Sequence, residues 1–229
     1  MKYALAFVGL ACLFQAPDAA AAKDGGDTAT VQGTGKDKRP SVEVLRKVAE
    51  TVGECIAGSR HGQAVDLVLS GKDSDADGIA TVACFYKGLT SQNVRGYALQ
   101  VYPTAAMRYL VADGLVRTDF RDRGPTDFSA VPPLDSTPPK GNKAADQAVL
   151  KARELADQIG ECTARVSPED VRRLSQTEAA SDAEIAQIKA LVPTFAQCLP
   201  PGVQLAFPPS VLRDSSVLAY ARLAYARRP

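Results

Sequence analysis

Apolar residues recur every three or four positions in two separate stretches of the chain. In the first stretch the apolar positions are Val42, Leu45, Val48, Ala49, Val52, Cys55 and Ile56. In the second they are Val149, Ala152, Leu155, Ala156, Ile159 and Cys162. This spacing is typical of an amphipathic helix with one buried stripe, and it places a cysteine on the buried side of each helix. Strand-type alternation is weak throughout, and residues 96–102 are the main candidate for a strand.

Further helices are predicted after each of these stretches. Ser41 is placed to cap the first helix. Short second helices are expected at about 62–70 and at 168–176, where a serine and a proline open the later one. The last helices should follow prolines and run over 104–117 and 210–226. The predicted fold class is therefore all-α.

A capping box marks the start of a third helix in the later part of the chain. Ser181-Asp182-Ala183-Glu184 has the serine and the glutamate three positions apart that this motif requires. Pro193 should kink that helix or divide it in two. In the earlier part, the corresponding helix is expected to open at Ser74-Asp75-Ala76-Asp77 and to be about two turns shorter before it reaches Cys84.

The chain contains an internal duplication. Residues 46–55 and 153–162 are identical at five of their ten positions, at an offset of 107 residues. Cys84-x-x-x-Gly88 matches Cys198-x-x-x-Gly202 at an offset of 114, and Arg108 matches Arg213 at an offset of 105. Three blocks in the same order predict two tandem repeats of a small three- to four-helix module. Residues related by these offsets are called equivalent.

Composition sets the boundaries of the repeats. Repeat 1 covers about 41–118 and repeat 2 about 146–227. Residues 119–145 hold five prolines and two glycines, which predicts an extended, poorly packed linker. Residues 23–40 carry almost no large apolar side chains and are expected to form a flexible arm.

The first 22 residues have the pattern of a secretory signal peptide. Lys2 supplies a positive charge, eleven apolar residues follow over 4–14, and the small residues Ala19–Ala22 offer a cleavage site. Eleven apolar residues are too few to span a bilayer, which needs about 20, so no stable membrane insertion is expected after cleavage. A retained anchor, or lipidation at Cys12, is the weaker interpretation. We expect a periplasmic or secreted protein.

Cleavage would leave four cysteines, an even number that indicates disulfides in an exported chain. They allow three connectivities, and the symmetry of the duplication favours Cys55 with Cys84 and Cys162 with Cys198. Modules of about 75 residues bury relatively little surface, so a covalent link matters for their stability. The chain has no Cys-x-x-Cys spacing, which argues against a catalytic redox pair.

The Gly-Glu-Cys helix, the Cys-x-x-x-Gly block and the terminal Pro-x-x-x-Leu/Met-Arg helix resemble small exported bacterial proteins that are uncharacterised and have no assigned activity. The resemblance covers both repeats. It implies a helical, disulfide-bonded protein of the cell envelope, and it supplies no catalytic or binding residues.

Charge and residue usage argue against several classes of function. The 229 residues include 27 Lys and Arg against 26 Asp and Glu, so no broad basic surface for nucleic acid is expected. One histidine and few cysteines leave little material for zinc or haem, and no cofactor is predicted. His61 is the one ordinary general base near neutral pH, but its equivalent is Pro168. A solvent-facing role between helices is therefore favoured for His61.

An aspartate ladder, Asp73-x-Asp75-x-Asp77-Gly78, matches the first half of a calcium-binding EF-hand loop. That loop needs a bidentate glutamate at its twelfth position, where this chain has Cys84. The aspartates also align with the capping box of repeat 2, and carboxylates at a helix N-terminus complement the helix dipole. We therefore predict no metal site, with calcium as the alternative.

Charged residues recur at equivalent positions in the two repeats. The pairs are Arg46/Arg153, Glu54/Glu161, Arg108/Arg213 and Arg117/Arg222. One interpretation is two equivalent sites for an anionic ligand. The favoured interpretation is two structural ion pairs, Glu54–Arg108 and Glu161–Arg213, which would fix the last helix of each repeat against the first.

These observations favour an exported, non-catalytic helical protein that binds an envelope protein or a small ligand. A cleft between the modules, or a groove within each, is the expected binding surface. The alternative is a periplasmic carboxylate-dependent hydrolase or an enzyme inhibitor, since glycoside chemistry requires two acids and no histidine. Two Asp or Glu side chains that face each other about 5–9 Å apart across a deep cleft would favour the enzyme.

Overall fold

The computed structural model describes residues 32–33, 40–70, 79, 81–94, 97–98, 104–135, 144–203 and 207–227. The described helices are α1 (Val42–Ser59), α2 (His61–Ser70), α3 (Val82–Ser91), α4 (Thr104–Asp119), α5 (Ala144–Val166), α6 (Pro168–Gln176), α7 (Asp182–Gln197) and α8 (Pro209–Ala226). Two short strands, β1 (Gln32–Gly33) and β2 (Tyr97–Ala98), form one antiparallel pair. The all-α prediction is confirmed, while the predicted signal peptide, residues 1–22, and the aspartate ladder, residues 73–78, lie outside the described residues.

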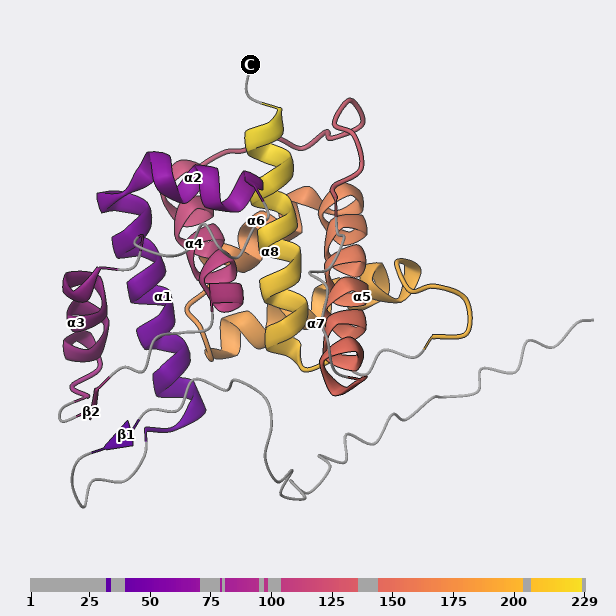
Figure 1. The fold of residues 1–229 in the computed structure, drawn as a ribbon. Helices are drawn as coiled ribbons and strands as arrows, with labels where there is room; N and C mark the ends of the chain where they lie inside the picture. Colours follow the sequence, from indigo (N-terminus) through magenta and orange to yellow (C-terminus); the bar gives the residue numbers. More distant parts are fainter. Residues whose placement is uncertain are drawn as a thin grey trace, which may run out of the picture.

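The helices form two halves with the same order of packing. In the first half α4 packs on α1, and in the second α8 packs on α5. The two last helices, α4 and α8, also pack against each other, so that α1, α4, α8 and α5 lie side by side (Figure 1). The short helices complete the arrangement, because α2 reaches across to α8 and α6 reaches across to α4.

Two glycines permit close crossings of the first and last helix in each half. A Cβ atom on Gly53 would lie 2.1 Å from the backbone oxygen of Leu110, and one on Gly160 would lie 2.5 Å from the backbone carbonyl of Ser215. Gly53 and Gly160 are equivalent, and so are Leu110 and Ser215. The glycine of each Gly-Glu-Cys sequence therefore occupies the same place in the two halves.

One hydrophobic cluster runs through both halves. Its largest fully buried side chains include Ile56, Leu67, Met107, Leu115, Ile159, Leu174, Leu191, Phe195, Tyr220 and Leu223. Because the stripe of α1 and the stripe of α5 face the paired α4 and α8, the four long helices share a single core rather than two separate ones. In the described part of the chain, no helix combines the length and the hydropathy that crossing a membrane requires.

The prediction of a poorly packed linker is wrong for the described stretch that follows α4. Phe120, Phe128 and Val131 are buried in the common core, although this stretch has no helix beyond α4. Tyr220 meets both phenylalanine rings edge-on, with centroids 5.9 and 5.6 Å away. Arg165 donates hydrogen bonds to the carbonyl oxygens of Phe128 and Val131. Scattered aromatic residues and a cationic side chain from another element thus hold a proline-rich segment that composition alone assigns to solvent.

Helix boundaries agree with several of the capping signals. Ser41 Oγ accepts a hydrogen bond from the N–H of Val44 at 3.3 Å, as expected for an N-cap. Ser181 caps α7 in the same way, but α7 continues through Pro193 as one helix instead of dividing. In the first half the predicted helix start at 74–77 lies outside the described residues, and the described third helix, α3, begins at Val82. Thr81 caps it through the N–H of Cys84, so the cysteine lies in the first turn of this helix instead of at its end.

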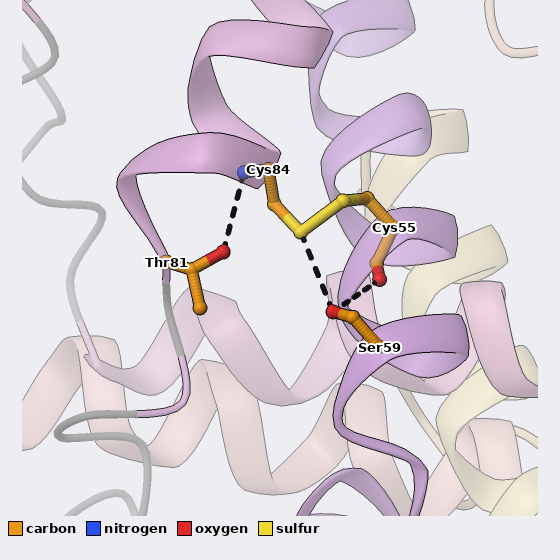
Figure 2. Close-up of a disulfide and its surroundings, with 4 residues drawn as sticks. All are labelled: Cys55, Ser59, Thr81 and Cys84. Carbon is orange, nitrogen blue, oxygen red and sulfur yellow. Dashed lines mark hydrogen bonds between the residues drawn. A yellow bond between two sulfur atoms is a disulfide. The ribbon is translucent and has the colours of Figure 1, made fainter.

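Each half contains one disulfide, with the predicted pairing. Cys55 of α1 is joined to Cys84 of α3, and Cys162 of α5 is joined to Cys198 at the end of α7. Figure 2 shows the first of these bonds between the two helices. In the chain-entropy description, loops of this length stabilise the folded chain by about 3–4 kcal/mol each.

Candidate functional site

Buried ion pairs join the two halves, and Glu184 at the start of α7 is one centre of this network. Its side chain is 2% exposed. Both carboxylate oxygens accept hydrogen bonds from Arg46 of α1, at 2.6 and 2.8 Å, and Oε1 also accepts from Arg213 of α8 at 3.0 Å. The backbone N–H of Ala180 donates to Oε2 at 2.9 Å. Glu184 therefore connects the first helix of one half with the last helix of the other.

Arg117 of α4 is the second centre of the network. Its guanidinium contacts Glu50 at 2.5 Å, Asp113 at 3.0 Å and Glu54 at 3.4 Å. Asp113 also pairs with Arg213 at 2.9 Å, which connects this centre to Glu184. Burial raises the pKa of Glu50, while the positive charge of Arg117 opposes the shift.

A pocket of about 200 Å³ lies beside the network, between the two halves. Its lining comes from α1, α4, the α6–α7 connection and α8, and consists of Arg46, Glu50, Tyr109, Leu110, Asp113, Ala179, Arg213 and Asp214. Four of the five charged residues that line this pocket, Arg46, Glu50, Asp113 and Arg213, take part in the ion pairs described above. The pocket thus combines a mainly apolar surface with a few charged groups, and both halves contribute to it.

Asp214 differs from the other acids of the pocket. It is solvent-exposed, and among the described residues no hydrogen bond or ion pair engages its carboxyl. The protein packed around one side of Asp214 removes part of its hydration and raises its pKa to about 7, although the rest of the side chain stays accessible to solvent; the nearby Asp113 adds to this shift, and Arg213 and Arg46 oppose it. At neutral pH this carboxyl is therefore close to the midpoint of its titration.

We expect Asp214→Asn to stabilise the protein at alkaline pH. A carboxyl whose pKa is raised on folding binds protons more tightly in the folded chain, so its contribution to stability falls as the pH rises from about 4 to 7. The variant should gain about 1 kcal/mol or less at pH 8, since solvent reaches this side chain, and should gain nothing at pH 4. Urea unfolding at the two pH values measures the difference, and an equal gain at both would contradict the assignment.

A tyrosine takes the place equivalent to that of Asp214 and lines the same pocket. Tyr109 is equivalent to Asp214, and Asp157 is equivalent to Glu50. The hydroxyl of Tyr109 donates to Asp157 at 3.0 Å, and the guanidinium of Arg153 lies 5.6 Å from the centre of the tyrosine ring. The large aromatic side chain of Tyr109 therefore reaches the carboxylate of Asp157, whereas the shorter side chain of Asp214 lines the pocket without a hydrogen bond to any described residue.

The imidazole of His61, at the start of α2, contacts Asp119 at the end of α4. Its Nε2 lies 3.0 Å from Asp119 Oδ2, which also accepts a hydrogen bond from the hydroxyl of Tyr225 at 2.8 Å. Burial alone would raise the pKa of Asp119, but the hydrogen bonds from Tyr225 and His61 outweigh it and hold that pKa below its ordinary value. About half of the His61 side chain is exposed (48%). This arrangement joins α2, α4 and α8 at the surface.

The predicted ion pairs were Glu54–Arg108 and Glu161–Arg213, and both pairings are wrong. The α1–α4 crossing explains why Glu54 does not pair with Arg108. It places Glu54 directly beside Gly114 of α4, where a Cβ on the glycine would lie 2.7 Å from the backbone N of Glu54. Arg117, one turn further along α4, therefore reaches Glu54, while Arg108 lies over the ring of Tyr109 at 5.9 Å.

In the second half, local geometry determines the partner of Glu161. It pairs with Arg165 on its own helix at 2.8 Å and accepts a hydrogen bond from the backbone N–H of Leu134. Arg213 turns instead to Asp113 and Glu184. Of the six duplicated arginines that were candidates for an anion site, Arg46, Arg117 and Arg213 are thus engaged by carboxylates.

Sequence reasoning missed Asp214 and the pocket. The sequence did mark Asp214 as unusual, because the duplication aligns this aspartate with a tyrosine.

No protein-family model matches the chain, and neither a curated protein nor a solved structure matches it. The described residues contain no group of His, Cys, Asp and Glu side chains arranged to hold a metal ion.

Proposed function

We propose that this protein is an exported, non-catalytic helical binding protein, and that its site is the pocket between the two halves. The signal-peptide pattern and the two disulfides support export, since disulfides persist in oxidising compartments. The volume of the pocket, about 200 Å³, is below the range of about 300–1,000 Å³ typical of pockets for drug-sized molecules. The ligand is accordingly small.

The chemistry of the lining favours a small ligand with an ammonium group and a short apolar body. The observation that carries this proposal is Asp214, the acid of the pocket that no described residue engages. A bound cation would ionise this carboxyl and pair with it, while Leu110, Tyr109 and Ala179 offer apolar contact. An anionic ligand would meet an excess of acids over bases.

A carboxylate-dependent hydrolase is the weaker candidate. Such chemistry needs two acids free to act on the substrate, one as acid and one as base or nucleophile. At this pocket Glu50 and Asp113 are held by Arg117 and Arg213. Asp214 alone supplies one reactive carboxyl, which supports binding over glycoside cleavage.

Calorimetric titration with n-butylammonium at pH 8 tests the proposal. We expect a dissociation constant of about millimolar, as for other very small ligands, and at least tenfold weaker binding to Asp214→Asn. Binding should also weaken at pH 6, where Asp214 is largely protonated. Asp66→Asn removes the same charge from the exposed surface of α2 and should leave the affinity unchanged.

One neutral probe and one anionic probe, each of the same size as n-butylammonium, complete the test. 1-Butanol and butyrate should bind at least tenfold more weakly than n-butylammonium, because neither pairs with a carboxylate. Equal affinity for 1-butanol would identify an apolar pocket, and preference for butyrate would identify an anion site. Either result would overturn the proposed ligand class.

A further inference from the structure

The two disulfides start from equivalent cysteines, but one ends at the N-terminus of a helix and the other at the C-terminus of a different helix. Cys55 and Cys162 are equivalent and lie four residues before the ends of α1 and α5. Their partners differ, because Cys84 lies in the first turn of α3, whereas Cys198 is the C-cap of α7. The helix dipole stabilises a thiolate at an N-terminus and destabilises one at a C-terminus. Cys84 is therefore the better leaving thiolate of the two.

A hydroxyl group lies beside the sulfur of Cys84. Figure 2 shows Ser59 next to the disulfide, with Oγ 3.7 Å from Cys84 Sγ and donating to the carbonyl oxygen of Cys55 at 2.7 Å. Rotation of this hydroxyl would turn its hydrogen toward a thiolate on Cys84. The residue equivalent to Ser59 is Val166, which has no such donor.

We propose that Cys55–Cys84 is a thiol–disulfide exchange site for an external dithiol, and that Cys162–Cys198 is a purely structural bond. Cys84 is buried and Cys55 is half-buried, so the incoming thiolate attacks Cys55 Sγ. A new S–S bond forms to Cys55 as the old one breaks, and its electron pair leaves on Cys84. The second thiol of the dithiol then displaces Cys55, so the dithiol is oxidised and both cysteines end as thiols.

Packing gives this exchange a structural consequence. Among the described elements, α3 packs only against α1, while α7 contacts α5, α6 and α8. Gly88 brings α3 so close to α1 that a Cβ there would lie 2.7 Å from a methyl of Val52 and 2.9 Å from the backbone oxygen of Val48. Opening the bond leaves α3 held by its interface with α1 alone, and its departure would expose Val48 and Val52.

The experiment is a kinetic reduction of the native protein with dithiothreitol, trapped by alkylation and read by peptide mass spectrometry. We expect Cys55 and Cys84 to be alkylated about tenfold faster than Cys162 and Cys198, a difference of the size that opposite helix ends produce. Hydrogen exchange of the partly reduced protein should show faster exchange in α3. Equal rates for the two bonds, or faster opening of Cys162–Cys198, would overturn the proposal.

Exchanging the equivalent residues separates the hydroxyl from the helix end. Ser59→Val should slow the opening of Cys55–Cys84 about threefold, because it removes the donor near Cys84. Val166→Ser, on an exposed side chain, should leave Cys162–Cys198 slow, because Cys198 still lies at the C-terminal end of α7. Acceleration of that second bond to the rate of the first would refute the contribution of the helix ends.

Discussion

Replacing Glu184 with glutamine is expected to lower the free energy of unfolding by about 3–5 kcal/mol, the cost of removing one partner from a buried ion pair. The amide keeps the size of the side chain and its acceptor for the Ala180 N–H. It removes the charge that faces Arg46 and Arg213, and Arg213 is only 3% exposed. Urea denaturation at pH 7 measures the loss.

The same variant should change the response of the protein to acid. Burial alone would raise the pKa of Glu184, but the hydrogen bond from Arg46 and the charges of Arg213 and Arg46 outweigh it and lower that pKa. A carboxyl with a lowered pKa contributes stability that is present above its unfolded value of 4.5 and is lost as the pH falls through the folded value. Glu184→Gln should therefore lose less stability than the native protein below pH 4.5.

A surface ion pair provides the matched control. Glu178 lies 2.5 Å from Lys47 but is 60% exposed, in contrast to Glu184. Exposed pairs contribute about 0–1 kcal/mol, so Glu178→Gln should cost no more than that. If both variants lost the same small amount, the Glu184 network would contribute nothing beyond ordinary surface electrostatics.

The duplication predicted the parts of this fold that depend on local pattern and on equivalence. The apolar stripes predicted helices α1 and α5, and the symmetry of the repeats predicted both disulfide pairings. The partners of the duplicated charges were not predictable, because a long arginine side chain reaches several acids. The crossing at Gly53 decides that Arg117, not Arg108, reaches Glu54.

The pocket escaped prediction for a related reason. It lies where α1, α4 and α8 come together, and the duplication does not say how the two halves are placed against each other. Asp214 could have been identified as unusual, since its equivalent is Tyr109, but its raised pKa depends on the surrounding protein. Likewise, the buried phenylalanines after α4 are single apolar residues in a proline-rich segment and follow no helical period.

The glycine of the Gly-Glu-Cys sequence is the second position at which a single change should have a large effect. We expect Gly53→Ala to destabilise the protein by about 2–4 kcal/mol, since added bulk in a tight contact forces the backbone to move. The new Cβ would lie 2.1 Å from the backbone oxygen of Leu110, and neither of the two helices can relieve this contact by turning a side chain. The α1–α4 crossing would have to widen.

Gly58 in the same helix serves as the control for this substitution. A Cβ at Gly58 would meet nothing within 4 Å, and the residue is exposed. Alanine there should stabilise the protein by about 0.5–1 kcal/mol, because glycine is a poorer helix former. Opposite signs for two identical substitutions five residues apart, measured by thermal or urea unfolding, would attribute the loss at Gly53 to the helix crossing. A stabilising effect at both positions would show that the crossing has room for a methyl group.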